Sequence, residues 1–312
     1  MQDREKLSKP KTDTRDAIER RTRKIFHDIH IGKTRCTSQL ERTLQSSNFE
    51  SFGVDKDFFV GKTCLEAGCG SLAPGAQNML ALGASKVYAI DVDESIFELA
   101  PKYLRPYEGR YDLRVGNVLS LDFPDSYFDF VLCYGVLHHT PAPLDGLRQL
   151  ARVTKPGGVL CVMTLGKGGL MEDIMDLFRR RYAADEEWKR TIDTLTDRDF
   201  FKMFSWIRNV MRDHDDTFID KIDDATFKAM FDEDLILTIR DRLQVPLYYR
   251  VSRQELVDAL WAEGFIKIER LSSYQHYKNI RRFLAPLYFE FDSPYAKLLY
   301  GDGYLQYKAT KG

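Results

Sequence analysis

Hydrophobic and polar positions follow two different periods along the chain. Residues 14–30 and 37–52 show helical spacing of their apolar side chains, so we expect two N-terminal helices. Between residues 62 and 164, short β-branched or aromatic runs alternate with helix-like segments, as in "KVYAID" followed by "ESIFELAPKYL". Alternating strands and helices are typical of a parallel sheet that is covered on both faces. This part of the sequence therefore predicts an α/β domain.

The alternation stops after residue 166 and resumes near residue 251. From residue 170 to about 245 the chain is helical in period and rich in large aromatic residues, which predicts a helical insertion over the sheet. "SRQELVDALWAEGFIKIERL" then fits a helix capped by Ser252 and Glu255, ended at Gly264 and followed by a strand, and "YLQYKAT" fits a closing strand. We expect an N-terminal helical segment (1–55), a core (56–166 with 251–312) and a helical cap (167–250).

Composition and charge narrow the class of protein. The chain has 46 Lys+Arg and 47 Asp+Glu, so its net charge gives no overall attraction to nucleic acid or to an anionic membrane. The first 24 residues contain no apolar run of the kind found in signal peptides, and a cytoplasmic location is expected. The five cysteines, Cys36, Cys64, Cys69, Cys133 and Cys161, form no CxxC pair. They are expected to be reduced and largely buried, with a metal or disulfide role as the alternative.

The stretch "TCLEAGCGSLAPG" is the first candidate for chemistry. Gly68 and Gly70 follow a strand-like run and precede a helix-like one, which suits a turn that brings a cofactor close to the backbone. Asp91 ends the next strand, where a carboxylate can accept hydrogen bonds from both hydroxyl groups of a ribose. Two alternatives stay open: the glycines serve only the turn, and Asp91 caps a helix that starts near Glu94.

Four motifs, in the same order and spacing, resemble a known family. "LEAGCGS", "YAIDVDE", "VGNVLSLDFPDSYFDFV" and "VLCYGVLHHTPAPLDGLRQLARVTKPGGVLCVMT" are similar to the motifs of class I S-adenosylmethionine (SAM)-dependent methyltransferases. The resemblance is close over residues 61–164 and loose over residues 251–310. It implies a Rossmann-like, doubly wound sheet of seven strands, with the helical N-terminal segment and the helical cap added to it. It also implies SAM as the cofactor and methyl transfer as the activity.

The resemblance also assigns roles to individual residues. It places Glu66, Gly68, Cys69 and Gly70 around the methionine part of SAM, Asp91 on the ribose, Val92, Asn117 and Val118 around the adenine, and Tyr134 near the cofactor. Two departures stand out, because the family often has Asp at the position of Asn117 and commonly has glycine at the position of Leu72. "GCGSLA" also fits the G-x-G-x-x-G/A pattern of dinucleotide-binding enzymes, so a nicotinamide-dependent oxidoreductase remains an alternative.

The loop after the fourth strand holds the candidates for catalysis. Tyr134, His138 and His139 lie there, and an imidazole can accept a proton from a hydroxyl or amino group near neutral pH. The alternative is that these histidines only bond the backbone or pack near the cofactor. "CYGV" stands where methyltransferases of nucleobase or amide nitrogens carry [DN]-P-P-[FY], which argues against those acceptors.

Substrate choice is expected to depend on the parts added to the core. Arg35, with Lys33, is a candidate clamp for the methionine carboxylate of the cofactor or for a substrate carboxylate. Tyr248, Tyr249 and Tyr274 are candidate pocket residues. An acidic cluster in residues 213–234 and the basic "RRTRK" are both interpreted as solvated faces. We expect a small-molecule acceptor with an O, N or S nucleophile, without a metal, nucleic acid or membrane. The alternatives are an RNA methyltransferase and transfer of another carbon arm of the sulfonium. The oligomeric state stays open.

Overall fold

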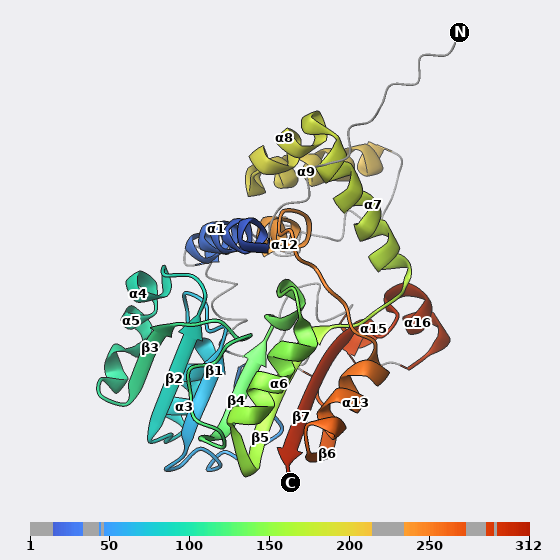
Figure 1. The fold of residues 1–312 in the computed structure, drawn as a ribbon. Coiled ribbons are helices and arrows are strands. Elements are labelled where there is room, and N and C mark those ends of the chain that lie inside the picture. The colour runs from blue at the N-terminus through green and yellow to red at the C-terminus, as the bar shows by residue number, and fades with distance from the viewer. Residues whose placement is uncertain (1–14, 34–43, 45–46, 214–233, 273–284, 290–291) are drawn as a thin grey trace.

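The computed structural model describes residues 15–33, 44, 47–213, 234–272, 285–289 and 292–312, and a seven-stranded sheet forms its centre (Figure 1). The strands are β1 (Thr63–Ala67), β2 (Lys86–Asp91), β3 (Tyr111–Val115), β4 (Phe128–Tyr134), β5 (Thr154–Leu165), β6 (Phe265–Arg270) and β7 (Tyr304–Lys311). Their order is β3-β2-β1-β4-β5-β7-β6, and β7 runs antiparallel to both of its neighbours. The expected seven-stranded α/β fold is confirmed.

The strand order creates a preferred position for a ligand. From β1 the chain builds the sheet outwards through β2 to β3, and it then returns to the other side of β1 to form β4 and β5. All four of these neighbouring pairs are parallel. In such sheets the crevice for a ligand lies at the carboxyl ends of the strands where the order reverses. The carboxyl ends of β1, β2 and β4 are therefore the edge to examine.

Helices and apolar side chains cover both faces of the sheet. The described helices of the core are α3 (Pro74–Ala81), α4 (Ile96–Leu99), α5 (Pro101–Leu104), α6 (Pro143–Val153), α13 (Arg253–Ala262), α15 (Pro286–Phe289) and α16 (Pro294–Tyr300), with 3-10 turns η1 (Arg105–Tyr107) and η2 (Leu137–His139). Along β4, Phe130 and Leu132 pack into the cluster below α3, whereas Val131 and Cys133 pack into the cluster below α6 and α13. This alternation is the period of a strand that is buried on both faces.

Two further predictions concern the cap of α13 and the cysteines. The capping box at the start of α13 is present, because the Ser252 hydroxyl accepts the N–H of Glu255 and the Glu255 carboxylate accepts that of Ser252. Cys64, Cys69, Cys133 and Cys161 are buried and free, while Cys36 lies outside the described residues.

Two predicted helices are wrong in part. Residues 47–53 form turns, because Asn48 and Ser51 bond each other's backbone through their side chains and so compete with helical hydrogen bonds. The rest of the expected helix 37–52 lies largely outside the described residues. The segment "ESIFELAPKYL" forms the two short helices α4 and α5 instead of one, and the break falls at Pro101, which has no N–H to continue the first helix.

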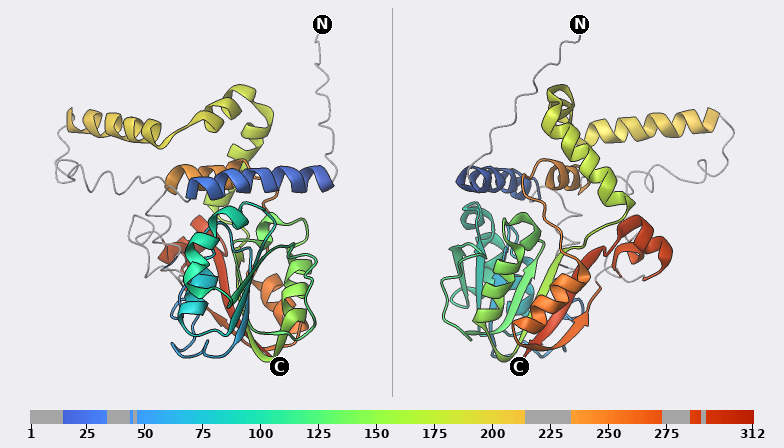
Figure 2. Two further views of the ribbon diagram at one scale, coloured as in Figure 1. Left: turned by 90° about the vertical axis from the view of Figure 1, so that its left-hand side faces the viewer. Right: turned by 45° about the vertical axis from the view of Figure 1, so that its right-hand side comes forward.

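One helix of the N-terminal segment and one of the cap lie over the carboxyl edge of the sheet. Figures 1 and 2 show α1 (Arg15–Lys33) crossing above this edge with α12 (Asp234–Leu243) beside it. The remaining cap helices α7 (Leu170–Ala184), α8 (Glu186–Thr194) and α9 (Asp197–Asp213) rise away from the sheet (Figure 2). No helix in the described ranges is long and apolar enough to cross a membrane. The division into segment, core and cap remains a prediction.

Candidate functional site

The glycine turn after β1 is held against β2 by backbone hydrogen bonds. The N–H groups of Gly68 and Cys69 both donate to the carbonyl of Ile90, at 2.8 and 3.0 Å. Gly68 and Gly70 have φ angles of 80° and 56°, which glycine adopts without strain. A Cβ atom on Gly68 would lie 2.0 Å from the Cγ2 atom of Val136, so this position also needs glycine for the close approach of the loop after β4.

The turn around Leu72, where the family commonly has a third glycine, has a conformation of its own. Leu72 is buried, and the next residue, Ala73, takes the left-handed conformation with φ 42° and ψ 52°. Gly75 then lets helix α3 approach the end of β1, because a Cβ atom there would lie 2.7 Å from the Glu66 carboxylate and 2.4 Å from Leu132. The turn therefore needs a small residue at position 75 instead of position 72.

Glu66 of β1 directs its side chain to the first turn of α3. Its two carboxylate oxygens accept the N–H groups of Gly75 and Ala76 at 2.9 and 2.7 Å. Burial raises the pKa of Glu66 to about 8, although the N–H donors of Ala76 and Gly75 act in the opposite direction. A dinucleotide needs free N–H groups at this helix end for its pyrophosphate. These N–H groups are already bonded, which suits a ligand without phosphate, such as SAM, better than a nicotinamide dinucleotide.

Asp91 connects the second strand to the glycine turn. Its Oδ2 atom accepts the N–H of Gly70 at 2.9 Å, and its Oδ1 atom accepts the N–H of Asp93 at 3.0 Å. Asp93, and not Asp91, accepts the N–H of Ser95 just before α4, so the alternative in which Asp91 caps that helix is wrong. Each carboxylate oxygen can accept a further hydrogen bond. Asp91 is therefore oriented by the loop and still able to bind two hydroxyl groups.

The residues predicted to surround adenine lie beside Asp91. The N–H of Gly116 donates to the carbonyl of Asp91 at 2.8 Å, which brings the end of β3 against the end of β2. The next residue, Asn117, accepts the N–H of Leu119 on its side-chain oxygen at 2.9 Å, which leaves that oxygen one further lone pair. Val92 is half-buried, and Val118 belongs to the core cluster below α6. The structure thus brings the predicted cofactor residues Glu66, Gly68, Cys69, Gly70, Asp91, Val92, Asn117 and Val118 to one edge of the sheet.

Tyr134 has a different environment from the two histidines of the same loop. Its hydroxyl accepts a hydrogen bond from the Gln306 amide at 2.9 Å, and the same amide donates to the carbonyl of Ser51. The Tyr134 ring lies 6.0 Å from that of Phe52 between centroids. Burial raises the pKa of the Tyr134 phenol, so it stays neutral. These contacts join β4 to β7 and to the turn before β1, and its proposed part in catalysis stays a prediction.

His139 is fixed at both ring nitrogens. Its Nδ1 atom lies 3.0 Å from the carbonyl oxygen of Leu247, and its Nε2 atom lies 3.2 Å from the Asp241 carboxylate. Phe26 of α1 packs edge-on against the ring at 4.8 Å between centroids. Each ring nitrogen thus faces an oxygen atom of the protein. His139 is therefore poorly placed to accept a proton from a substrate.

His138 is the histidine with a free ring nitrogen. Its Nδ1 atom is buried and has no hydrogen-bond partner among the described residues. Burial lowers the pKa of His138 well below 6.5, and the neighbouring His139 lowers it further. The ring packs between His139 and Tyr248, at 4.1 and 5.9 Å between centroids. A neutral imidazole with an unused nitrogen can accept a proton.

The structure adds residues that the motifs do not reveal. Asp241 and Leu247 approach His139 from the end of the cap, and Phe26 approaches it from α1. His27 of α1 lies beside Asp93, and Tyr248, a predicted pocket residue, packs against both histidines. For Asp241, Phe26 and His27 the sequence gives only the helical period of the segments that carry them, and for Leu247 it gives no signal.

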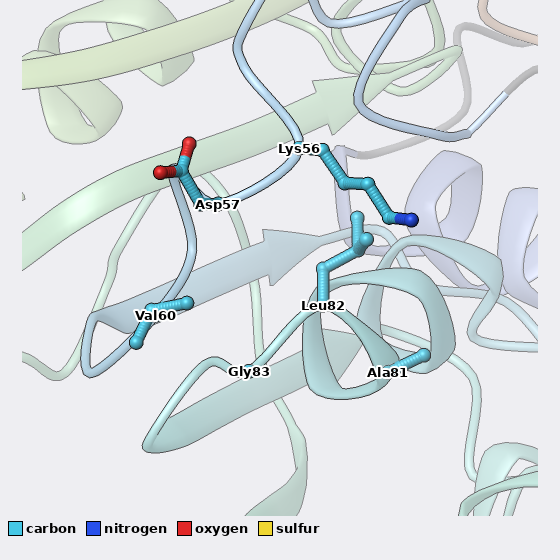
Figure 3. Close-up of a pocket in the computed structure, with 6 residues that line it drawn as sticks. All are labelled: Lys56, Asp57, Val60, Ala81, Leu82 and Gly83. Atoms are coloured by element: carbon cyan, nitrogen blue, oxygen red, sulfur yellow. The ribbon is translucent and has the colours of Figure 1, made fainter.

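Of the other predicted residues, Tyr249 reaches this loop through its backbone and the rest lie outside the described ranges. The N–H of Tyr249 donates to the carbonyl of His138 at 2.7 Å, and 46% of the residue's surface is exposed. Arg35, Tyr274 and the acidic residues of 214–233 lie outside the described residues, as does the side chain of Lys33. The open pocket in Figure 3 is lined by Lys56, Asp57, Val60, Ala81, Leu82 and Gly83. It lies between the segment before β1 and the end of α3, at the amino ends of the strands, and is therefore not the candidate site.

Comparison with known proteins places the core in a family. Residues 65–162, from β1 to β5, match the family model of a methyltransferase domain. The demethylmenaquinone methyltransferase of Geobacillus stearothermophilus is 28% identical over 158 residues, which cover 48% of this chain and 65% of that protein. The mitochondrial ubiquinone biosynthesis O-methyltransferase of Schizosaccharomyces pombe is 35% identical over 116 residues, or 36% of this chain and 41% of that protein.

Among solved structures, a SAM-dependent methyltransferase from Thermotoga maritima aligns with 93% of this chain and 100% of its own, at 14% identity and a TM-score of 0.47. The alignments to the two relatives above span less than two thirds of each relative's length. The matched segment 65–162 contains Glu66, Asp91, Asn117 and both histidines. Through this core, the chain is similar to SAM-dependent methyltransferases.

Proposed function

We propose that this protein transfers the methyl group of SAM to an O, N or S atom of a small molecule. The observation that carries the proposal is the hydrogen bonding of the glycine turn. Glu66 bonds the first N–H groups of α3, and Asp91 is oriented by Gly70 with oxygens left for a ribose. This arrangement fits a nucleoside without phosphate. Bound SAM would supply an electrophilic methyl group on a sulfonium.

The residues of the chain then have separate tasks. Asp91 would bind the ribose hydroxyls, and Asn117 with Val118 would meet the adenine. The loop after β4 would align the acceptor, which is the main requirement of an in-line displacement and is worth roughly 7–11 kcal/mol when the alignment is complete. With an acceptor that must lose a proton, His138 would take it on its free Nδ1 atom, while Asp241 and Leu247 keep His139 in place.

The acceptor is expected to be a small molecule for two reasons. By their names, one relative is a demethylmenaquinone methyltransferase and the other an O-methyltransferase of ubiquinone biosynthesis. In addition, α1 and α12 lie over the carboxyl edge, and Phe26 contacts His139, which narrows the approach to the loop after β4 (Figure 1). A covered edge favours a compact acceptor over a folded RNA.

Binding and product mass together test this function. Calorimetry with S-adenosylhomocysteine (SAH) should show a 1:1 complex, and NAD should show none. Incubation with methyl-deuterated SAM and a pool of phenols, amines and thiols should add one labelled methyl group to a pool member. Binding of NAD without binding of SAH would support the nicotinamide alternative and end this proposal. A gain in product mass other than one methyl group would indicate transfer of another carbon arm.

A further inference from the structure

Three arginines lie near Tyr248 on the cap side of the site, and they differ in their partners. Arg250 is paired with carboxylates. Its Nε atom lies 2.5 Å from Glu172, and its two terminal nitrogens donate to the two oxygens of Asp176 at 3.0 and 2.9 Å. The Arg250 guanidinium also lies 5.2 Å from the centre of the Tyr248 ring. The charge of Arg250 is therefore compensated within the protein.

Arg179 is satisfied by backbone carbonyls. It donates to the carbonyl of Arg242 and, at 2.9 and 3.3 Å, to those of Val245 and Pro246. The last carbonyls of a helix carry partial negative charge, and a cation placed there is favourable. Because Arg242 lies in the last turn of α12, Arg179 caps the carboxyl end of that helix.

Arg242 has weaker compensation than the other two arginines. Its guanidinium donates to the hydroxyl of Tyr304 at 2.8 Å. Within the described part of the chain, it forms no ion pair at contact distance, and the carboxylates of Asp241 and Glu172 favour its charge only from farther away. The side chain is half-buried, so its remaining donors are partly withdrawn from water. An arginine without a direct carboxylate partner in such a position can receive an anion.

The position of Arg242 connects it to the candidate site. Tyr304 is the first residue of β7 and lies opposite Leu165, at the carboxyl end of β5. The residue before Arg242 is Asp241, whose carboxylate bonds His139. The neighbouring His138 carries the buried Nδ1 atom without a partner. An unpaired cation and an unused ring nitrogen thus belong to the same end of the sheet.

We propose that Arg242 binds a carboxylate on the methyl acceptor, an inference that rests on the proposed methyl transfer. The planar guanidinium can donate two parallel hydrogen bonds to a carboxylate, and Tyr304 fixes its orientation. The substrate class is then a small carboxylic acid that also carries the nucleophilic O, N or S atom. Aromatic acids fit best, because the rings of Phe26, Tyr248 and the two histidines line this side.

The test measures binding of benzoate, with benzamide as its neutral isostere, to the wild-type enzyme by calorimetry, with and without saturating SAH. Benzoate should bind at least about tenfold more tightly than benzamide, because a hydrogen bond to a charged group contributes more than one between neutral groups. In Arg242→Gln this preference should fall to about twofold or less. Arg148→Gln, on the exposed surface of α6, is the matched control and should keep the preference.

Two results would overturn the inference: equal binding of benzoate and benzamide to the wild type, or an intact preference in Arg242→Gln. An intact preference together with a loss of SAH affinity would assign Arg242 to the carboxylate of the cofactor. Arg242→Lys keeps the positive charge but loses the two parallel donors of the guanidinium. It should therefore retain part of the preference for benzoate over benzamide. Failure of the proposed function shows separately, because the wild type would then not bind SAH.

Discussion

The two halves of the candidate site are built in different ways. The cofactor half, at the ends of β1 and β2, uses short connections in sequence: Glu66 bonds Gly75 and Ala76, and Asp91 bonds Gly70. The acceptor half, after β4, uses long ones: His139 bonds Leu247, 108 residues away, and contacts Phe26 of α1. The first half satisfies its carboxylates with backbone N–H groups. The second leaves a ring nitrogen and an arginine unpaired.

This difference suggests how the two halves can change independently. A loop held by its own backbone keeps its shape whatever packs above it, which suits a cofactor common to a family. Side chains brought from α1 and α12 can be exchanged without disturbing the sheet, which suits recognition of a particular acceptor. We therefore expect substitutions in one half to leave the other half's binding nearly unchanged.

The largest effect on turnover is expected for His138→Gln. Loss of the free imidazole nitrogen should lower kcat by about 10²-fold or more for an acceptor that must lose a proton. SAH affinity should stay within about twofold. Because burial places the pKa of His138 well below 6.5, the wild-type kcat should not fall between pH 8 and 6.5 through protonation of this ring. Initial rates with one acceptor across this pH range, and calorimetry with SAH, give both quantities.

The thermal midpoint of His138→Gln provides its folding control. A folded variant with nearly normal kcat on a hydroxyl or amine acceptor would contradict a role for His138 as the base. A normal rate on a thioether acceptor alone would not, since that nucleophile has no proton to lose.

The cofactor half could be predicted from the sequence because its determinants are local. The order of strands, the glycine turn and Asp91 all follow from short motifs that repeat one pattern of strand, turn and helix. Even so, the motifs did not reveal that Glu66 bonds α3 or that Ala73 takes the left-handed conformation. Both depend on how Gly75 packs against β1, which is a matter of distance in space.

The acceptor half could be predicted only in part. "LHH" drew attention to the turn after β4, but the sequence could not distinguish the two histidines. Asp241, which engages His139, comes from a segment whose helical period says nothing of its direction, and Leu247 follows that segment without any pattern of its own. The same holds for Arg242, whose lack of a carboxylate partner is a property of packing and leaves no pattern in the sequence.

The next effect in size is expected for Asp91→Ala. Loss of the charged hydrogen bonds to the ribose should weaken SAH binding by about 1–3 kcal/mol, or roughly 5- to 150-fold. Part of this loss would come from the Gly70 N–H, which Asp91 now bonds. Asp125→Ala, whose side chain is 76% exposed, is the control and should bind SAH normally. Unchanged SAH affinity in Asp91→Ala would remove this residue from the ribose site.

The raised pKa of Glu66 should make the free energy of unfolding depend on pH. The pKa of Glu66 rises from its ordinary value of 4.5 to about 8 on folding, so between these pH values the folded chain holds a proton that the unfolded chain releases. This contribution to stability is complete below pH 4.5 and is lost as the pH rises to 8, with a slope of at most about 1.4 kcal/mol per pH unit. Relative to Glu66→Gln, urea unfolding of the wild type should therefore show stability that declines over this range. Parallel curves for the two proteins would contradict a raised pKa.

The smallest effects should come from α1, which contacts both halves. His27 lies 3.2 Å from Asp93, beside the ribose acid, and its side chain is 45% exposed, so the contact is worth about 1 kcal/mol or less. His27→Gln should raise the SAH dissociation constant by up to about fivefold and leave acceptor KM unchanged. Phe26→Leu, which alters the ring contact with His139, should change the acceptor KM and leave the SAH dissociation constant unchanged. Lys24→Gln, at an exposed position of α1, should change neither constant. If His27→Gln and Phe26→Leu each changed both constants, α1 would act as one rigid cover, and the independence of the two halves would fail at this helix.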